Sequence, residues 1–104
     1  MKTYTVLQLK NALDKKEDLF LLDVRHTQER AYGVLPLDHH IPMHEIETRL
    51  EELPHDKKII VYCRTGNRSG FVTSFLESKG FHKVFNLEGG ILAWKKYDPS
   101  VKEY

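Results

Sequence analysis

Two short apolar runs constrain the fold of this chain more than any other feature. Leu19–Val24 and Ile59–Tyr62 consist almost entirely of leucine, isoleucine, valine and aromatic residues. A strand with one face in water alternates apolar and polar residues, whereas a continuous apolar run is typical of a strand buried on both faces. Such strands need helices on both sides. The two runs therefore predict an α/β fold with a mainly parallel central sheet in a three-layer α/β/α arrangement.

Helical patterns separate the apolar runs, so that strands and helices alternate along the chain. Thr5–Gln8 has the pattern of a capping box, which begins a helix. In the first half of the chain the patterning predicts a helix to about Asp14, a strand over Leu19–Val24, a short helix over Thr27–Tyr32 ending at Gly33, a loop over Val34–Pro42 with one short strand near Ile41, and a helix over His44–Leu53 closed by Pro54. In the second half it predicts a strand over Ile59–Tyr62 and a helix beyond Ser69 with apolar Phe71, Val72, Phe75 and Leu76 that stops at Gly80. A strand over Lys83–Leu87, a turn at Gly89-Gly90 and a helix over Ile91–Lys96 with Trp94 in the core complete the chain. Parallel sheets bind ligands at the carboxyl ends of their strands, where Asp23 and Cys63 are both expected.

The size and composition of the chain exclude several classes of protein. With 104 residues, of which 40% are hydrophobic and 30% charged, we expect a single domain over residues 1–104. A formal net charge of +1 argues against nucleic-acid binding, which needs a clustered basic excess. The apolar runs are too short to span a membrane, and no apolar signal sequence follows Met1. One cysteine excludes an internal disulfide and suits a reducing compartment, so we expect a cytoplasmic protein.

That cysteine, Cys63, stands between a predicted buried strand and a predicted helix start. The intervening loop, Arg64–Ser69, contains a glycine, an asparagine and two arginines. A strand, a tight loop and a helix N-terminus in succession point several backbone N–H groups into one concave space, where the helix dipole adds positive charge. Such surroundings lower the pKa of a thiol. We therefore expect Cys63 to be a thiolate at neutral pH, a nucleophile facing an anion pocket.

Four groups of residues stand in an order and at intervals that identify a family. They are Leu21–Arg25 followed by Glu29 and Gly33, Ile59–Gly70 around the cysteine, Gly80-Phe81 with Val84, and Leu87–Ile91 followed by Ala93-Trp94. With these groups the chain resembles a single-domain rhodanese, of the thiosulfate sulfurtransferase family, over nearly its whole length. The resemblance implies a rhodanese-like domain with Cys63 in its active-site loop.

One loop departs from the family pattern. Rhodaneses commonly run from a glycine through histidine, isoleucine, proline, glycine and alanine toward a second proline, and the aligned residues here are Gly33–Pro42. Val34 replaces the histidine, and Leu37-Asp38 replaces the small pair. Because this loop packs the domain in the family, we expect the departure over Val34–His40 to alter the conformation of the loop more than the chemistry.

The resemblance implies a rhodanese-type sulfurtransferase that needs no cofactor. Cys63 thiolate would attack the outer sulfur of a donor anion such as thiosulfate, sulfite would leave, and cyanide or a thiol would then take the sulfur from a Cys63 persulfide. The expected substrate-binding residues are Arg64, Thr65, Gly66, Asn67, Arg68 and Ser69. Their N–H groups would hold negative charge, and the side chains of Arg64 and Arg68 would add charge-assisted contacts. Asp23 and Arg25 are expected to support the adjacent loops as a pair, and a sulfur-relay protein could be a partner.

Two other functions remain open from the sequence. A cysteine-dependent phosphatase or arsenate reductase also holds a thiolate and an oxyanion in a loop. Those enzymes usually have a longer spacing than that between Cys63 and Arg68, and no residue is identifiable as the general-acid aspartate of a phosphatase. A persulfide carrier, which receives sulfur from a protein partner without turnover of its own, would need the same loop as a rhodanese.

The histidines invite a metal-site interpretation that the sequence does not favour. His40 and His44 stand four residues apart, which on a helix would place both on one face. Pro42 breaks such a helix, and no cysteine or paired carboxylates complete a ligand set. We therefore predict no metal site.

Overall fold

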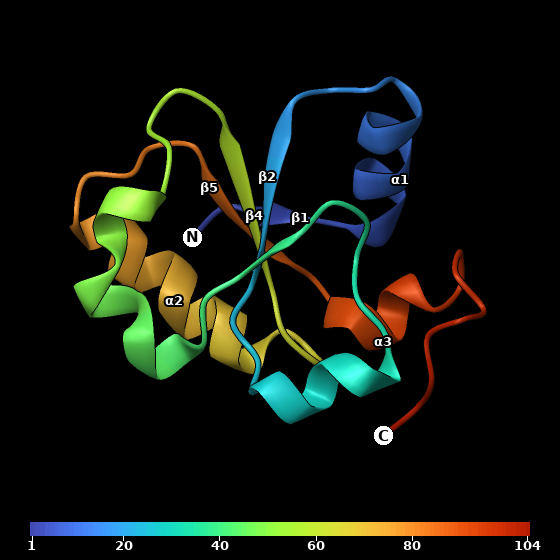
Figure 1. The fold of residues 1–104 in the computed structure, drawn as a ribbon. Coiled ribbons are helices and arrows are strands. Elements are labelled where there is room, and N and C mark those ends of the chain that lie inside the picture. The colour runs from blue at the N-terminus through green and yellow to red at the C-terminus, as the bar shows by residue number, and fades with distance from the viewer.

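The computed structural model describes residues 1–104 and contains one sheet of five parallel strands. The strands are β1 (Thr3–Tyr4), β2 (Leu19–Asp23), β3 (His39–His40), β4 (Lys58–Tyr62) and β5 (Val84–Leu87), in the spatial order β1-β5-β4-β2-β3. One face is covered by α2 (Asn67–Ser78) with η2 (Met43–Thr48) and η3 (Leu50–Glu52), and the other by α1 (Val6–Asp14) and α3 (Gly90–Trp94) (Figure 1). The predicted three-layer α/β/α fold is confirmed.

The strands β2 and β4 lie side by side at the centre of the sheet. Their register pairs Leu19 with Lys58 at one end and Asp23 with Tyr62 at the other. Every residue of Ile59–Tyr62 is at most 1% exposed, which confirms a strand buried on both faces. Because the two strands end in register, the residues that follow them meet at the same edge of the sheet. In Figure 1 this edge faces η1 (Thr27–Tyr32), which lies below the strands.

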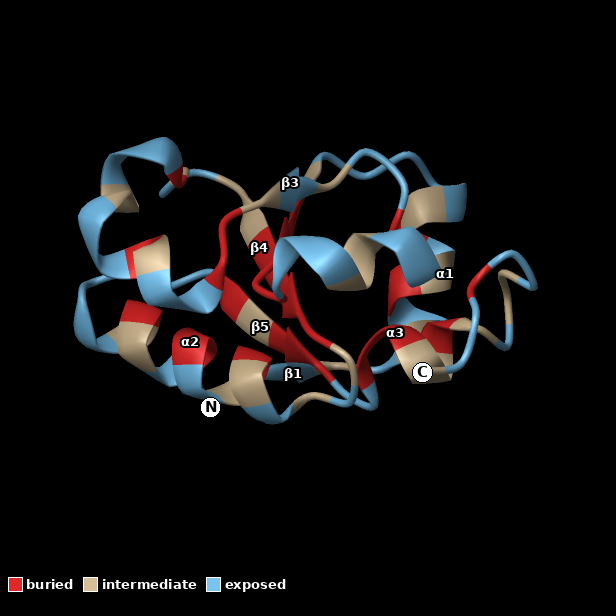
Figure 2. Cartoon of the chain, turned by 60° about the horizontal axis from the view of Figure 1, so that its bottom comes forward, coloured by how far each residue is buried: buried red, intermediate tan, exposed pale blue.

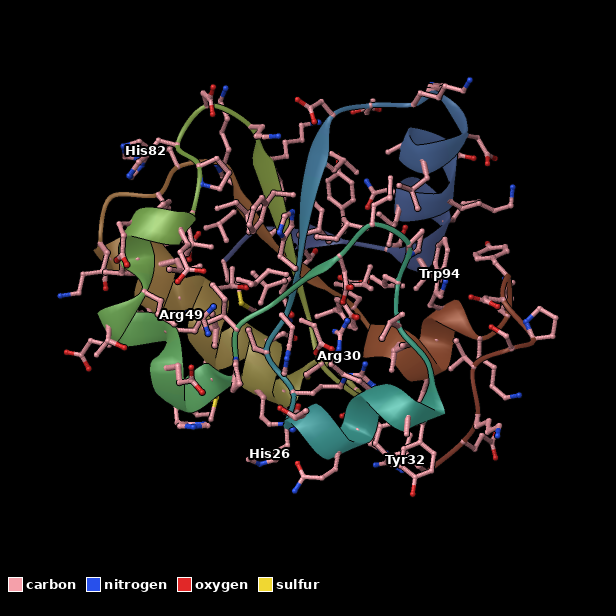
Figure 3. The ribbon with its side chains drawn as sticks, viewed as in Figure 1. His26, Arg30, Tyr32, Arg49, His82 and Trp94 are labelled. Atoms are coloured by element: carbon pink, nitrogen blue, oxygen red, sulfur yellow. The ribbon has the colours of Figure 1, made fainter.

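The hydrophobic core is divided by the sheet into two clusters. Ile59 and Val61 belong to the cluster under α2, whereas Ile60 and Tyr62 belong to the cluster under α1 and α3. This alternation follows from the strand period of two residues. Trp94, predicted to be core, is the last residue of α3, is 6% exposed and belongs to the same cluster as Leu9 of α1 (Figure 3). Figure 2 shows the buried residues concentrated in the strands and on the sides of the helices that face them.

The start of α1 is fixed by the predicted capping box. The Thr5 hydroxyl accepts a hydrogen bond from the Gln8 backbone N–H (3.1 Å), and the Gln8 side chain accepts one from the Thr5 N–H (2.8 Å). The two bonds satisfy backbone donors that the first turn would leave free. The stripe predicted for this helix is buried through Leu9 and Ala12.

The predicted helix over His44–Leu53 is wrong in type, because the structure has two short 3₁₀ helices, η2 and η3, in its place. The Thr48 hydroxyl donates to the carbonyl of Glu45 (3.0 Å), and the Arg49 N–H donates to the carbonyl of Ile46 (3.0 Å). In an α-helix the Arg49 N–H would bond to Glu45 instead. The threonine side chain thus takes the acceptor that an α-helical turn needs.

Smaller differences concern short elements and one side chain. The helix over Thr27–Tyr32 is also 3₁₀, although it ends at Gly33 as predicted, and the last helix ends at Trp94. The sequence did not predict β1, which is too short to show a period.

Phe71, grouped with the apolar face of α2, is 78% exposed, because the helix turns it away from buried Val72. None of the helices has the length and apolar character needed to span a bilayer.

Candidate active site

Cys63 follows β4 directly and lies at the N-terminus of α2. Its Sγ accepts hydrogen bonds from the backbone N–H groups of Gly66 (3.1 Å) and Ser69 (3.4 Å), and it lies 3.3 Å from the Ser69 hydroxyl. The residue is 1% exposed. Ser69 is the third residue of α2, so the sulfur occupies the position at which a capping side chain normally accepts from the helix. The sequence prediction of a cysteine facing N–H donors at a helix start agrees with this geometry.

These contacts change the acidity of the thiol. Burial of Cys63 acts to raise its pKa, but the hydroxyl and N–H of Ser69 and the N–H groups of Gly66 and Thr65 outweigh burial. The net result is a pKa below that of an ordinary cysteine. Hydrogen bonds to the charged form and the helix N-terminus thus favour the thiolate, the nucleophilic form.

The loop also presents N–H groups that have no partner. No protein group accepts hydrogen bonds from the backbone N–H groups of Arg64, Asn67 and Arg68. Thr65 and Asn67 are exposed, and the loop turns at Gly66, whose φ of 109° favours glycine. A sulfur atom with N–H donors on one side, and free donors beside it, is a site where an anion can bind close to a nucleophile.

Asn86 of β5 holds the loop in this shape. It accepts a hydrogen bond from the Ser69 hydroxyl (2.5 Å) and donates one to the carbonyl of Gly66 (3.1 Å). The Ser69 hydroxyl has one hydrogen, so its donation to Asn86 competes with donation to the Cys63 thiolate. Sequence reasoning did not select Asn86 as a site residue. The available signal was a polar residue inside a predicted buried strand, where a polar side chain needs a partner.

The start of α3 secures the loop from the other side. The N–H groups of Ile91 and Leu92 donate to the carbonyls of Cys63 (2.9 Å) and Arg64 (3.2 Å). A Cβ atom at Gly90 would collide with both carbonyl groups, so only glycine fits there. This close approach explains Gly90, which the sequence indicated only as part of a turn.

Arg68 does not point freely into the site. Its guanidinium forms a bidentate ion pair with Glu29 of η1, with N–O distances of 2.6 Å and 2.9 Å. Glu29 also accepts a hydrogen bond from the Tyr104 hydroxyl (2.7 Å) and one from the backbone N–H of His26 (3.1 Å). The Arg68 bonds, with smaller contributions from Tyr104 and His26, lower the pKa of Glu29 to about 2. The carboxylate is therefore charged throughout the neutral range.

Arg64, by contrast, forms no ion pair. Its guanidinium lies 5.2 Å from the ring centre of Tyr104, a cation–π distance, and its buried Nε has no hydrogen-bond partner. Tyr104 itself stacks on Tyr32 of η1 at 4.6 Å. The segment leading to Tyr104 is held nearby through the Lys102 N–H, which donates to the Tyr32 carbonyl (2.7 Å). Sequence reasoning did not identify Tyr104, because nothing in the local pattern around it indicates a contact with η1.

Asp23 and Arg25 form a buried pair behind the loop, and both are 0% exposed. Asp23 accepts hydrogen bonds from Nε and Nη2 of Arg25 (3.0 Å each) and from the Arg25 backbone N–H (2.9 Å). Arg25 also donates to the carbonyls of Glu29 and Gly33, which bracket most of η1. The pair forms no hydrogen bond with Cys63 and instead fastens η1 to the end of β2.

The loop that departs from the family pattern is fastened by Asp38. Its carboxylate accepts hydrogen bonds from the guanidinium of Arg30 (2.8 Å and 3.1 Å) and from the Tyr62 hydroxyl (2.7 Å). Arg30 reaches from η1 toward the sheet in Figure 3 and also bonds to Asp23 (2.9 Å). Leu37, which replaces a family glycine, is 94% exposed with a φ of 51°. The departure from the family pattern thus adds a charged, hydrogen-bonded side chain at Asp38 and backbone strain at the neighbouring Leu37.

Comparison with known proteins agrees with this geometry. A family model described as the rhodanese-like domain matches residues 5–97. A protein of Allochromatium vinosum named sulfurtransferase is 39% identical over 89 residues, covering 86% of this chain and 83% of that protein. A rhodanese-like domain protein of Staphylococcus aureus has a crystal structure that superposes with a TM-score of 0.85 at 35% identity, covering 90% of this chain and 91% of that one.

A third similarity involves part of a larger protein. The structure of an NAD-dependent persulfide reductase from A. fulgidus superposes with a TM-score of 0.73 at 37% identity, covering 90% of this chain but 16% of that one. The resemblance inferred from the four sequence motifs is thereby confirmed. Because the family match spans most of the chain and the full-length similarities agree with it, the chain belongs to the rhodanese-like domain family.

Proposed function

We propose that this protein is a sulfurtransferase, which moves sulfane sulfur from a donor such as thiosulfate to cyanide or a thiol through a persulfide on Cys63. The family to which the chain belongs, and a relative named sulfurtransferase, support sulfur transfer as the class of activity. The similarity to part of a persulfide reductase supports persulfide chemistry in particular.

The observation that carries the proposal is the arrangement around the sulfur. Two N–H groups hold Sγ of Cys63, and three more, from Arg64, Asn67 and Arg68, have no partner in the protein. A persulfide is an anion, and so is a thiosulfonyl donor. Donors that are already in place stabilise both without reorganisation during the reaction.

Both halves of the proposed cycle conserve atoms and electrons without any cofactor. The Cys63 thiolate attacks the outer sulfur of thiosulfate, a new S–S bond forms, and the old S–S bond breaks. Sulfite leaves with the electron pair of that bond, and the persulfide Cys63–S–S⁻ remains. An acceptor such as cyanide then attacks the outer sulfur and leaves as thiocyanate, which returns Cys63 to the thiolate. The chain has no second cysteine, so the sulfur must leave to an external acceptor.

Turnover with thiosulfate and cyanide, in the absence of any other protein, tests the proposal. We expect steady turnover, and intact-mass spectrometry after thiosulfate alone should find one added sulfur per chain, which cyanide removes. A stable sulfur adduct without turnover would identify the protein as a persulfide carrier, consistent with a role in a sulfur relay. No adduct, together with hydrolysis of a phosphate ester or reduction of arsenate, would overturn the proposal in favour of the phosphatase or reductase alternative.

A further inference from the structure

The ion pair between Glu29 and Arg68 is less exposed and has more hydrogen bonds than a typical surface ion pair. The Glu29 side chain is 16% exposed, and four donor groups surround its carboxylate, two of them from Arg68. The pair joins residues 39 positions apart and connects η1 to the loop that holds Cys63. Tyr104 closes the far side, because its hydroxyl donates to Glu29 while accepting from Arg25 (2.9 Å). The carboxylate is thus held in place from three directions.

The pair also changes the charge that a donor meets. Of the two arginines in the loop, Arg68 is neutralised by Glu29, and Arg64 has no acidic partner. Arg68 immediately precedes Ser69, whose N–H donates to the Cys63 sulfur (3.4 Å), so its backbone lies beside the sulfur. Bonding to Glu29 raises the pKa of Arg68, and the negative charge of Cys63 raises it further. The thiolate offsets the remaining charge of Arg64. A dianion approaching Cys63 therefore meets a rim with almost no net positive charge from side chains.

We propose that Glu29 is a specificity-determining positioning residue: by neutralising Arg68 it favours sulfur donors with a single negative charge, such as persulfides, over the dianion thiosulfate. The inference rests on the proposed sulfur transfer through Cys63. It names the class of donor for which the site is built. Glu29 acts through Arg68 and contacts neither the sulfur nor the donor.

Two donors of nearly the same shape isolate the effect of charge. Thiosulfate carries two negative charges, and methanethiosulfonate, in which a methyl group replaces one oxygen, carries one. With either donor the Cys63 thiolate attacks the terminal sulfur, forms an S–S bond and breaks the bond to the sulfonyl sulfur. The leaving group is sulfite in one case and methanesulfinate in the other, and both leave the same persulfide on Cys63. The ratio of kcat/KM for thiosulfate to kcat/KM for methanethiosulfonate, with cyanide as acceptor, therefore reports donor charge.

The test compares two single variants with their double variant. Glu29→Gln keeps an acceptor for the His26 N–H but leaves Arg68 charged and unpaired, so the ratio should rise about tenfold, the lower end of the effect of a hydrogen bond to a charged group. Arg68→Gln leaves the Glu29 charge exposed, so the ratio should fall by a similar factor. The double variant has a neutral pair and should return to within about twofold of the native ratio. Glu52→Gln is the matched control, because it removes a carboxylate from a two-pronged pair with Arg49, outside the loop, and should leave the ratio unchanged.

Several results would overturn the inference. If Arg68 contacted the donor directly, the double variant would have the same low ratio as Arg68→Gln instead of the native ratio. Single variants that shift the ratio in the same direction, or not at all, while mass spectrometry still finds the Cys63 persulfide, would reject the role of Glu29 and leave the proposed function intact. If Glu29→Gln fails to fold, Arg68→Gln and the double variant still decide the matter. Absence of a persulfide on the native protein with both donors would reject the proposed function and the inference together.

Discussion

Two adjacent strands, β2 and β4, end at the same edge of the sheet, and the polar groups that follow them are satisfied in opposite ways. After β2, Asp23 meets Arg25 and Arg30, so that a buried negative charge is surrounded by positive ones. After β4, the sulfur of Cys63 meets backbone N–H groups and a hydroxyl, and no cationic side chain bonds to it. Ion pairs in the interior resist change, because removing one partner leaves an uncompensated charge. Backbone dipoles instead stabilise an anion while leaving it free to react.

Substitutions at the two strand ends should therefore have different consequences. Substitutions at the end of β2 should lower stability and leave the chemistry per folded molecule intact. Substitutions at the end of β4 should alter the chemistry and leave stability nearly intact. Substitutions at both strand ends test that separation.

Replacing the proposed nucleophile should produce the largest loss. Cys63→Ser should abolish sulfur transfer and persulfide formation, because a serine hydroxyl neither ionises readily nor holds a transferable sulfur. The serine oxygen can accept from the same N–H groups, so the free energy of unfolding should change by no more than about 1 kcal/mol. Turnover with thiosulfate and cyanide, and urea denaturation, measure the two quantities. A variant that keeps about a tenth of the native rate would contradict the role of Cys63.

Removing the charge at the end of β2 should produce the largest loss of stability. Asp23→Asn leaves the buried Arg25 guanidinium without its counter-ion and should lower the free energy of unfolding by about 3–5 kcal/mol. Urea denaturation measures the loss. The rate of Cys63 alkylation in the folded fraction should stay within about twofold of the native rate, since no hydrogen bond joins the pair to the sulfur.

An exposed pair provides the control for that experiment. Asp14 pairs with Lys10 on the surface of α1, and Asp14→Asn should leave the urea midpoint unchanged. If Asp23→Asn behaved like Asp14→Asn, the buried pair would not fasten η1 to the sheet as described.

A smaller effect is expected from the hydroxyl beside the sulfur. Ser69→Ala removes a group that lowers the pKa of Cys63, so that pKa should rise. The reactive thiolate then forms at higher pH, and the midpoint of the rate-against-pH curve for alkylation by iodoacetamide should move upward. At neutral pH the rate should fall about 3- to 10-fold, the value of one hydrogen bond. Ser74→Ala, at an exposed position of α2, is the control and should leave the midpoint where it is. A midpoint that stays in place or moves down in Ser69→Ala would show that the backbone N–H groups alone set the acidity.

The smallest effect should be a gain in stability. Leu37 is exposed and has a positive φ, so Leu37→Gly removes backbone strain of about 1–2 kcal/mol and loses little packing. The greater freedom of glycine in the unfolded chain offsets part of that, which leaves a gain of about 0.5–1 kcal/mol in urea denaturation. Cys63 alkylation should not change. A destabilised Leu37→Gly would show that the leucine side chain, and not its backbone, supports Asp38.

The sequence determined the features that depend on neighbours along the chain. The runs Leu19–Val24 and Ile59–Tyr62 indicated buried strands because their pattern leaves no face for water, and the capping box at Thr5 fixed a helix start through residues three positions apart. The position of Cys63 between a strand and a helix start was enough to predict N–H donors around its sulfur. Family motifs then identified the fold, since their order and spacing follow the same local elements.

Which distant side chains meet at the strand ends depends on how the layers pack in the folded chain. The sequence predicts Arg68 as a donor-binding residue, and the topology brings η1 beside the loop and gives Arg68 the partner Glu29, which no local pattern indicated. Asn86 and Tyr104 reach the same region from β5 and from the segment after α3. The energy of such contacts depends on which faces the folded layers place together, and a local pattern carries no information on that. The sequence therefore predicts the nucleophile and its backbone donors, whereas the charge that surrounds them is set by the folded chain.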